Sequence, residues 1–420
     1  MTSTYATNGV PADHDHASTA DHSHVERLTF LDFFAGAGLV RLGLEPSWSC
    51  VWANDIDSRK QQIYEAHFGS ENFVLGDVAG IRTDSLPAGA DMAWASFPCQ
   101  DLSLAGWRKG MRAERSGTYW EFWRLMRDSL YEGDRPPLIV IENVVGMLYG
   151  KNFPILCESL ADLGMQFGPL VIDARQFLPQ SRPRVFVVAV DSRVDCSLLV
   201  NEEVTEAPWF TKAAKSAHTR FPATLRDSWR WWKLPEPSST ISPVEDIIEG
   251  NPTSVQWHEP KETKRLLAMM TDVNSRKTER AIERGRSVGF IYKRIRQGVQ
   301  RAEVRFDGVA GCLRTPQGGS SRQIVLAVDE GTVRSRLLSP REAARLMGVP
   351  DSFWLPSRYN DAYRAIGDGV AVPVVRWLSD QLLVNLARLC RDSRVDTRAK
   401  DQGDLVRTGS AVGRLLRRSP

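Results

Sequence analysis

The sequence predicts an α/β protein in which a mostly parallel, doubly wound sheet is joined to a second, smaller domain. Short apolar runs recur at LTFLDF, CVWAND, MAWASF, LIVIENV and RVFVVAV, separated by helix-length amphipathic segments such as SGTYWEFWRLMRDSLYEG. Strands that alternate with helices are typical of parallel sheets, and the continuously apolar runs LIVI and VFVVAV fit strands buried on both faces. After about Asp191 the alternation fades into the Trp-rich and Pro/Ser-rich stretch SWRWWKLPEPSSTISP and then a charged one, which predicts the second domain.

The composition is that of an ordinary globular protein. The chain has 420 residues, of which 42% are hydrophobic and 25% charged, and at roughly 100–200 residues per domain this length predicts two or three domains. The net charge of +3 provides no global attraction to a polyanion, so nucleic-acid binding must depend on a local basic patch. The six Cys are scattered without a C-x-x-C pair, and no apolar run approaches the ~18 residues of a membrane span. We therefore expect a cytoplasmic protein with reduced thiols, no metal site and no membrane contact.

The first apolar run leads into a glycine-containing turn and a helix, in LTFLDFFAGAGLVRLGLE. Gly36 and Gly38 would let the backbone turn tightly beneath a nucleotide-like ligand. The third Gly of the dinucleotide fingerprint is absent, so NAD is not favoured over another adenosine-containing cofactor. Asp55 and Asp77 follow the next two strands, which predicts a cofactor at the carboxyl edge of the sheet.

Reactive side chains follow the later strands. The string SFPCQD places Cys99 on a polar loop after Pro98, where a core role for the thiol is a poor alternative. LIVIENV ends at Glu142, and QSRPR places Arg182 and Arg184 before another strand. A thiol, a carboxyl and two guanidiniums therefore emerge from neighbouring elements of one sheet.

In this order, the motifs resemble those of the DNA (cytosine-5)-methyltransferases. DFFAGAG resembles the cofactor motif, FPCQDLS the catalytic motif, ENV the third signature and QSRPR the Q-x-R-x-R motif. RLLSPREAARLMGVPDSF and AIGDGVAVPVV resemble the two closing motifs, with the variable target-recognition region between QSRPR and RLLSPRE. The resemblance covers roughly Leu28 to Leu389 and implies a Rossmann-like, S-adenosylmethionine-dependent sheet with a smaller target-recognition domain.

The resemblance also implies a division of the chain and a set of cofactor contacts. The expected segments are a disordered tail (1–26), a catalytic and cofactor-binding domain (27–192), a target-recognition domain (193–356), a closing segment of the catalytic domain (357–392) and a disordered basic tail (393–420). The implied S-adenosylmethionine contacts are Phe34, Ala35, Gly36, Gly38, Asp55, Ile56, Asp77, Val78, Pro98, Asp368 and Val370.

The same resemblance assigns the chemistry. Cys99 would add to carbon 6 of a flipped-out cytosine, which makes carbon 5 able to attack the sulfonium methyl. A free thiol is only a few per cent ionised at neutral pH, and the guanidiniums of Arg182 and Arg184 would raise that fraction. Glu142 would hold the cytosine at N3 and the amino group, so the pKa of its carboxyl should be raised. No protein base for the carbon 5 proton is evident, and that step is left to water.

Double-stranded DNA is the expected partner, because the resemblance implies a substrate base extruded from a duplex. Basic residues outnumber acids between Arg276 and Arg322, and we interpret them as phosphate contacts rather than a solvated helical face with Arg276–Glu279 and Arg280–Glu283 pairs. The expected DNA contacts are Gln100, Ser103, Arg314 and Arg322.

The last motif departs from the family pattern, since Gly367-Asp368-Gly369-Val370 stands where G-N-x-V is common. Asp368 keeps an acceptor oxygen but loses the amide donor and adds a charge, which leaves cofactor affinity there in question. A tRNA cytosine-5 methyltransferase and a catalytically silent DNA-binding relative are the alternatives. The former tends to carry a C-F-T string, which the sequence lacks. We expect a monomer with a role in restriction-modification or phage defence alongside a separate restriction or defence protein.

Overall fold

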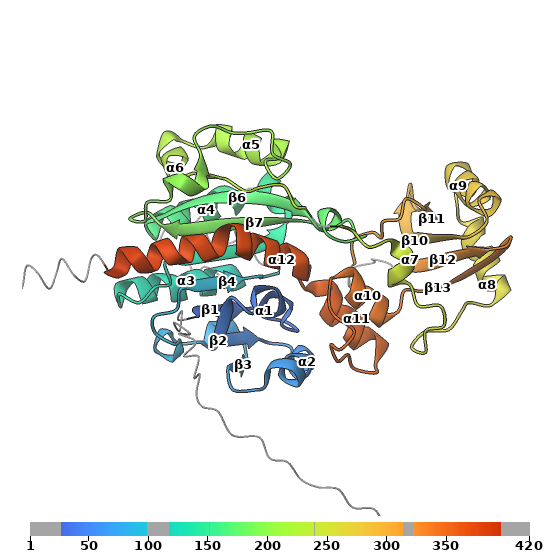
Figure 1. The fold of residues 1–420 in the computed structure, drawn as a ribbon, viewed down its shortest axis with the longest axis horizontal. Helices are drawn as coiled ribbons and strands as arrows, with labels where there is room; N and C mark the ends of the chain where they lie inside the picture. Colours follow the sequence, from blue (N-terminus) through green and yellow to red (C-terminus); the bar gives the residue numbers. More distant parts are fainter. Residues whose placement is uncertain (1–26, 99–116, 151, 239, 314–321, 396–420) are drawn as a thin grey trace, which may run out of the picture.

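The fold has two sheets of different kinds (Figure 1). The computed structural model describes residues 27–98, 117–150, 152–238, 240–313 and 322–395. The seven strands of the larger sheet lie in the order β3-β2-β1-β4-β5-β7-β6, and β7 runs antiparallel to both β5 and β6. The strands are β1 (Leu28–Phe33), β2 (Trp48–Asp55), β3 (Phe73–Leu75), β4 (Met92–Ala95), β5 (Leu138–Val144), β6 (Met165–Asp173) and β7 (Pro183–Asp191). The five apolar runs of the sequence are therefore strands of one sheet, and β3 and β6 join them.

Helices cover both faces of this sheet, which confirms the doubly wound α/β prediction. Strand β5 is buried from Leu138 to Asn143, as its apolar run predicted. Helix α2 begins after Asp57, whose side chain accepts a hydrogen bond from the amide of Arg59 at 3.0 Å. The helices of this part are α1 (Leu39–Leu44), α2 (Ser58–Phe68), α3 (Thr118–Tyr131) and α4 (Asn152–Asp162), with short helical turns η1 (Val78–Gly80), η2 (Thr83–Ser85), η5 (Val145–Tyr149), η6 (Ala174–Gln176) and η7 (Ser197–Leu199).

The Trp-rich segment packs on the larger sheet and not in the smaller domain. Trp209, Trp229 and Trp232 belong to the larger core, and the indole N–H of Trp232 donates to the carbonyl of Gly168 at 3.1 Å. A Cβ at Gly168 would lie 1.9 Å from the carbonyl oxygen of Arg230, so β6 accepts this layer only with glycine there. The layer holds β8 (Val200–Asn201), β9 (Trp231–Trp232), α5 (Lys212–Arg220) and α6 (Ala223–Asp227), whereas α7 (Val244–Ile247) lies against α10 (Pro340–Leu346) at the junction with the smaller sheet (Figure 1).

The smaller unit has its own core and a four-stranded antiparallel sheet in the order β11-β10-β12-β13. Leu266, Ile291, Val304 and Leu326 are among the buried residues between its sheet and its helices. The elements are α8 (Pro260–Ala268), α9 (Asp272–Glu283), β10 (Ser287–Arg296), β11 (Val299–Arg305), β12 (Ile324–Asp329) and β13 (Thr332–Leu337). The expected domain boundaries stay predictions. The indoles of the Trp-rich layer are buried in the larger core, and so are Phe290, Ala310, Leu313 and Val325 from the later segment.

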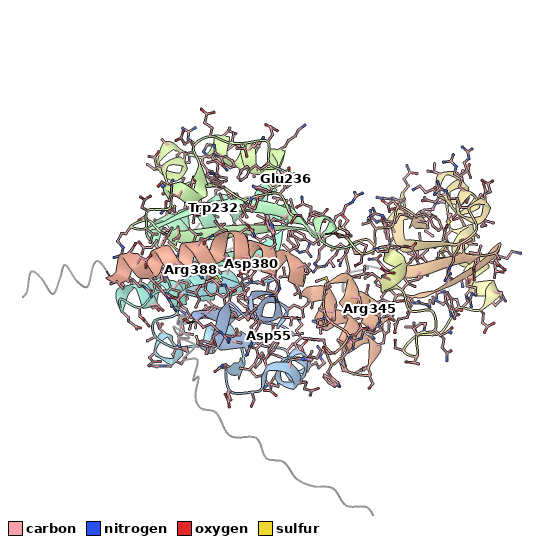
Figure 2. All side chains as sticks on the ribbon, in the orientation of Figure 1. Asp55, Trp232, Glu236, Arg345, Asp380 and Arg388 are labelled. Carbon is pink, nitrogen blue, oxygen red and sulfur yellow. The ribbon has the colours of Figure 1, made fainter. Side chains whose placement is uncertain are left out.

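The chain returns to the larger core through α10 (Pro340–Leu346), α11 (Tyr359–Asp368) and α12 (Val372–Leu378), a π-helical turn η9 (Ser379–Leu383) and a helix over 384–395. Figure 1 shows α10 and α11 between the two sheets, and Figure 2 shows Arg345 within this junction and Asp55 in the larger part of the molecule. Over the described ranges, no helix is long and apolar enough to span a bilayer.

A buried polar cluster holds the two ends of the smaller unit together. Arg336 and Glu342 form a fully buried ion pair at 2.6 Å. Arg336 also donates to the carbonyl of Glu249 at 2.8 Å, and Glu342 accepts from the amide of Glu249 at 2.8 Å. Removing one partner from such a pair leaves an uncompensated buried charge, which costs roughly 3–5 kcal/mol. The exit and the return of the chain are therefore fixed at one place.

Candidate active site

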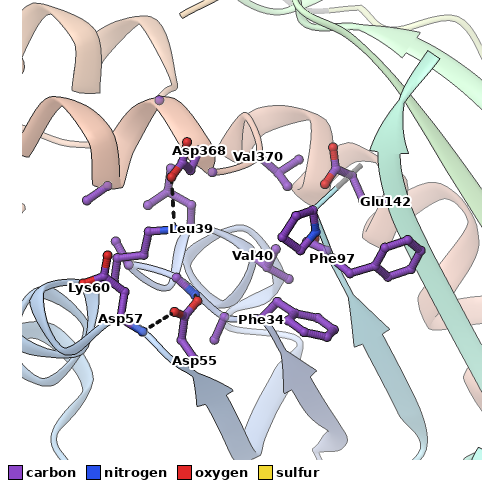
Figure 3. A pocket seen from close by; sticks show the side chains of 18 of the residues that line it. Phe34, Leu39, Val40, Asp55, Asp57, Lys60, Phe97, Glu142, Asp368 and Val370 are labelled. Atoms are coloured by element: carbon purple, nitrogen blue, oxygen red, sulfur yellow. Dashed lines mark hydrogen bonds and ion pairs between the residues drawn. The ribbon is translucent and has the colours of Figure 1, made fainter. Parts of the chain in front are cut away.

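A pocket of about 940 Å³ lies at the carboxyl ends of β1, β2, β4 and β5 and is closed by residues from the end of α11 (Figure 3). Its volume is at the upper end of the range typical of ligand sites, about 300–1,000 Å³. The residues proposed from the sequence that line it are Phe34, Ala35, Gly36, Asp55, Ile56, Asp77, Val78, Pro98, Glu142, Arg182, Arg184, Asp368 and Val370. Gly38 lies in the turn below the pocket, and Cys99, Gln100, Ser103 and Arg314 lie outside the described residues.

We call the side of the pocket formed by the β1–α1 turn and the ends of β2 and β3 the β1–β2 half. Phe34, Gly36 and Gly38 all have left-handed backbones, with φ of 61°, 59° and 82°. A Cβ at Gly38 would lie 2.5 Å from the ring of Phe68, so the turn tolerates no side chain there. Phe34 adopts this conformation without being glycine, which is typical of strain held at a functional site. The backbone conformation of this turn is therefore fixed both by its left-handed φ angles and by the close packing against Phe68.

Asp55 ties this turn to the end of β2. Its carboxylate accepts a hydrogen bond from the amide of Gly36 at 2.9 Å and one from the amide of Asp57 at 2.9 Å. Figure 3 shows the Asp55 side chain at the floor of the pocket. Ile56, the next residue, lines the pocket although 69% of it is exposed, so an apolar surface is available to a flat ring. Asp77 accepts from the amide of Ala79 at 3.0 Å and caps η1.

Beneath the turn lies a buried acid that sequence reasoning did not single out. Both carboxylate oxygens of Asp32 are buried, and no hydrogen-bond partner for them exists among the described residues. Burial raises the pKa of Asp32 to about 8, against the opposing effect of Arg41, while the negative charge of Asp55 adds to the rise. Asp32 is therefore neutral at pH 7.

The opposite side, formed by the ends of β4, β5 and β7 and the segment at 312–313, is the β5–β7 half. Arg184 Nε lies 3.1 Å from the Glu142 carboxylate, and both side chains are largely buried. Burial raises the pKa of Glu142, and the nearby Arg184 and Arg182 and a hydrogen bond from Ser96 limit the rise. The direction agrees with that expected of a carboxyl able to donate a proton.

Asn143, next to Glu142, positions the loop that leads to Cys99. Its side-chain amide donates to the carbonyl of Phe97 at 3.0 Å, and its side-chain oxygen accepts from the amide of Val144 at 2.9 Å. The ends of β4 and β5 are thereby joined just before Pro98. The ENV string contained Asn143, but only the pairing of the two strands reveals this contact.

The two arginines of QSRPR have different surroundings. The guanidinium of Arg182 is buried and donates to the carbonyls of Leu313, Gly367 and Gly369 at 3.1, 2.8 and 2.6 Å. Burial, with a smaller contribution from Arg184, lowers the pKa of Arg182 to about 10. Through these bonds Arg182 links the segment at Leu313 to the end of α11 at Gly367 and Gly369. Arg184 instead faces Glu142.

A thiol that was not among the candidate residues from the sequence lies in this half. Cys312 lines the pocket, with its Sγ 3.3 Å from Arg182 Nη1 and 3.8 Å from Arg184 Nη2. The motifs placed both guanidiniums near Cys99, which lies outside the described residues, and gave no signal for Cys312. The structure makes Cys312 part of the pocket wall.

Lys60 is a second residue that the motifs did not reveal. It lies on α2, lines the pocket, and its Nζ is 3.1 Å from Asp368 Oδ2 at the end of α11. Figure 3 shows this ion pair above Asp55. No local pattern could have found it, because a lysine on an amphipathic helix is ordinarily solvated.

The basic stretch forms part of the smaller unit. Its exposed members include Arg276, Arg280 and Arg286, while Arg294 and Arg296 lie 3.5 and 2.8 Å from Glu303. Within the part of the chain that the structure describes, neither Arg276–Glu279 nor Arg280–Glu283 forms an ion pair. Arg322 lies over the ring of Tyr359 at 5.2 Å and donates to Asn360, and it is not among the pocket-lining residues. The described ranges contain no cluster of His, Cys, Asp and Glu able to hold a metal.

The sheet order and a pocket at the strand ends, with a glycine turn on one side and a carboxyl on the other, define a Rossmann-like fold with a ligand site at the carboxyl edge of its sheet. The chain belongs to the C-5 cytosine-specific DNA methylase family, whose model matches residues 28–383. Members of this family use S-adenosylmethionine and a covalent cysteine adduct, and the chain is accordingly a DNA cytosine-C5 methyltransferase.

Named relatives and one solved structure agree with this assignment. Type II methyltransferase M.DsaV of Dactylococcopsis salina is 26% identical over 363 residues, covering 85% of this chain and 86% of that protein. Type II methyltransferase M.NlaX of Neisseria lactamica is 27% identical over 364 residues, covering 85% and 96%. The structure of the Entamoeba histolytica methyltransferase EhMeth is 16% identical, covers 86% of this chain and 99% of that one, and has a TM-score of 0.57, a likeness in fold.

Proposed function

We propose that this chain methylates carbon 5 of cytosine in a specific duplex DNA sequence, with S-adenosylmethionine in the β1–β2 half and the extruded base in the β5–β7 half. The observation that carries the proposal is Glu142: a buried carboxyl of raised pKa, held by Arg184 at the end of the strand next to the one that leads to Cys99. A protonated carboxyl can donate to a ring nitrogen that a carboxylate would repel.

The residues of the β1–β2 half fit S-adenosylmethionine by their chemistry. The Asp55 carboxylate has acceptor capacity beyond its two backbone donors and would hold the ribose hydroxyls. The exposed side chain of Ile56 and the ring of Phe34 would pack on the adenine, with Asp77 and Val78 beside it. The bound cofactor would supply an electrophilic methyl group on a sulfonium.

The chain's residues would act in the following sequence. The thiolate of Cys99 forms a bond to carbon 6 while Glu142 gives its proton to N3, and the electron pair of the 5,6 double bond becomes available at carbon 5. Carbon 5 would then be able to accept the methyl group that S-adenosylmethionine, held by the residues of the β1–β2 half, would supply from its sulfonium. Water takes the carbon 5 proton, the double bond reforms, the Cys99 sulfur leaves, and N3 returns its proton to Glu142.

The direct test compares duplex DNA and tRNA as methyl acceptors for the wild type and Cys99→Ser. We expect transfer to DNA by the wild type, none by the variant, and equal S-adenosylmethionine affinity in both. Duplex DNA with 5-fluorocytosine at the target should trap a covalent adduct, because fluorine cannot leave as a proton does. Transfer to tRNA alone, or turnover by Cys99→Ser, would contradict the proposal. Bisulfite sequencing of DNA from expressing cells identifies the target sequence.

The exposed basic residues of α9 and β10 support DNA as the partner, because their charges could bind phosphates. Each neutralised phosphate releases counterions, so the logarithm of the affinity should fall linearly with the logarithm of salt concentration. Arg280→Gln should reduce the magnitude of that slope by about one unit if this side chain contacts a phosphate. Fluorescence anisotropy over a salt series measures the slope, and a flat response would exclude a DNA-binding surface here.

The relatives are named type II methyltransferases, and by analogy we propose that the chain acts as a monomer alongside a separate restriction or defence protein.

A further inference from the structure

The ion pair between Lys60 and Asp368 lies on the wall of the pocket and joins parts of the chain that are distant in sequence. Lys60 comes from the first turn of α2, and Asp368 ends α11. Their charged atoms are 3.1 Å apart, and 17% of the lysine side chain and 32% of the aspartate side chain are exposed. Both residues line the pocket, so a ligand there can reach both charges.

The aliphatic part of Lys60 places this pair beside the glycine turn. Its Cδ lies 3.9 Å from where a Cβ of Gly36 would be. The amide of Gly36 is bound by Asp55, which we have proposed for the ribose. The pair is therefore next to the ribose position, on the side of the turn closed by α11 (Figure 3).

A second cation lies close to Asp368. Arg364, one turn earlier on α11, has its Nε 3.7 Å from the same carboxylate oxygen and also lines the pocket. One carboxylate is thus flanked by two cationic groups, so the cluster can accept an anion and a cation side by side.

We propose that Lys60 and Asp368 bind the amino-acid end of S-adenosylmethionine, Lys60 through the α-carboxylate and Asp368 through the α-ammonium. The inference rests on the proposed function. The amino-acid end carries one positive and one negative group on a single carbon, and a lysine–aspartate pair presents the complementary charges at short distance. On binding, each protein group exchanges its partner for one of opposite charge on the ligand, so no charge is left unpaired.

The assignment also explains how this chain functions with Asp368 where the family pattern has Asn. An Asn offers both an acceptor and a donor, whereas a carboxylate offers acceptors alone. Lys60 supplies the missing donor and neutralises the added charge. Lys60 is therefore a cofactor-positioning residue that compensates for Asp at position 368.

Binding measurements with three adenosyl ligands test the proposal. S-Adenosylmethionine has both groups, decarboxylated S-adenosylmethionine keeps the amine without the carboxylate, and 5′-methylthioadenosine has neither. By titration calorimetry without DNA, we expect Lys60→Met to weaken S-adenosylmethionine about tenfold, as for loss of a charged hydrogen bond, with methylthioadenosine unchanged and a smaller effect on the decarboxylated ligand. Lys60→Arg should restore binding.

Asp368→Asn provides the reciprocal measurement. We expect it to weaken the decarboxylated ligand, which depends on Asp368 for its amine. In the Lys60→Met background it should recover part of the lost affinity for S-adenosylmethionine, because it removes an unneutralised charge and restores an amide donor. Additive losses in the double variant would contradict the proposed compensation.

Arg59→Met is the matched control. Arg59 is the neighbouring residue on α2 and also pairs across to α11, with Asp361 at 3.5 Å, but it does not line the pocket. A purely structural role for charge pairs between these helices predicts equal losses in Arg59→Met and Lys60→Met, or equal losses for all three ligands, and either result overturns the inference. If Lys60→Met binds S-adenosylmethionine and methylthioadenosine with the same affinities as the wild type, the inference is also overturned. The proposed function stays intact in that case, because the wild type still binds the cofactor. A wild type that binds none of the ligands overturns both.

Discussion

The two halves of the pocket are built in different ways. In the β1–β2 half, Asp55 binds backbone amides 19 and 2 residues away, and one continuous stretch of chain forms the turn and the floor. In the β5–β7 half, Arg182 binds carbonyls 131, 185 and 187 residues away, so the wall exists only once the chain has returned from the smaller unit. Substitutions in the first half should therefore alter ligand affinity, and those in the second should alter chemistry and stability.

The largest expected effect separates the halves by function. Glu142→Gln should lower kcat by about 100-fold or more, the usual effect of removing a general acid, and leave S-adenosylmethionine affinity unchanged. Asp55→Ala should instead weaken S-adenosylmethionine and have less effect on kcat at saturation. Single-turnover kinetics and calorimetry on both variants measure the two effects, and a loss of cofactor affinity in Glu142→Gln would show that the halves are not independent.

The pH dependence of Glu142 sharpens this first comparison. Burial raises the pKa of Glu142, so the proton needed for donation to N3 is present below the raised pKa and is lost as the pH increases through it. Wild-type kcat should consequently fall on the alkaline side. Glu142→Gln should lack that fall, and an unchanged pH profile in this variant would assign the titration to another group.

The next effect concerns the two arginines of the β5–β7 half. Arg182→Met leaves buried carbonyls of three residues without a donor, and we expect the free energy of unfolding to fall by about 3 kcal/mol. Arg184→Met should lower the free energy of unfolding by less, because Glu142 can take up a proton once its cationic partner is absent. Urea denaturation of both variants measures the difference, and equal losses would mean that the bonds of Arg182 do not carry the link between returning segments.

The smallest effect tests the buried acid beneath the β1–β2 half. The folded-state pKa of Asp32, about 8, is above its unfolded value of 3.8, so the folded state binds the extra proton between these values. Stability therefore falls as the pH rises from 4 to 8 through this group. Asp32→Asn, which removes the titration, should gain stability relative to the wild type between pH 5 and pH 8.5, because only the wild type must give up the extra proton over this range. Denaturation at both pH values measures this, and a pH-independent difference would show that Asp32 finds a partner for its charge.

What the sequence could predict follows the same division. The turn at Gly36 and Gly38 and the acid at Asp55 were predictable because the strand, the glycines and the next strand end are consecutive in the chain. Glu142 and Arg184 were predictable as members of motifs, but their contact at 3.1 Å required the antiparallel placement of β7 beside β5.

Long-range packing accounts for what the sequence did not predict. Cys312 and Lys60 belong to no motif and enter the pocket only through the positions of other elements. The Trp-rich layer was assigned to the smaller domain because its composition differs from that of the preceding strands. Composition does not reveal which core a segment joins, and burial of Trp232 against Gly168 decides it.

The joining of Glu249 to Arg336 and Glu342 has a consequence for how this protein can diversify. The segment between these residues leaves the larger core and rejoins it at one clasped point, but its residues 312 and 313 return to the pocket wall, where Arg182 binds the carbonyl of Leu313. The parts of the smaller unit outside this stretch can therefore change in length and sequence while the pocket walls, and the reaction they serve, stay the same.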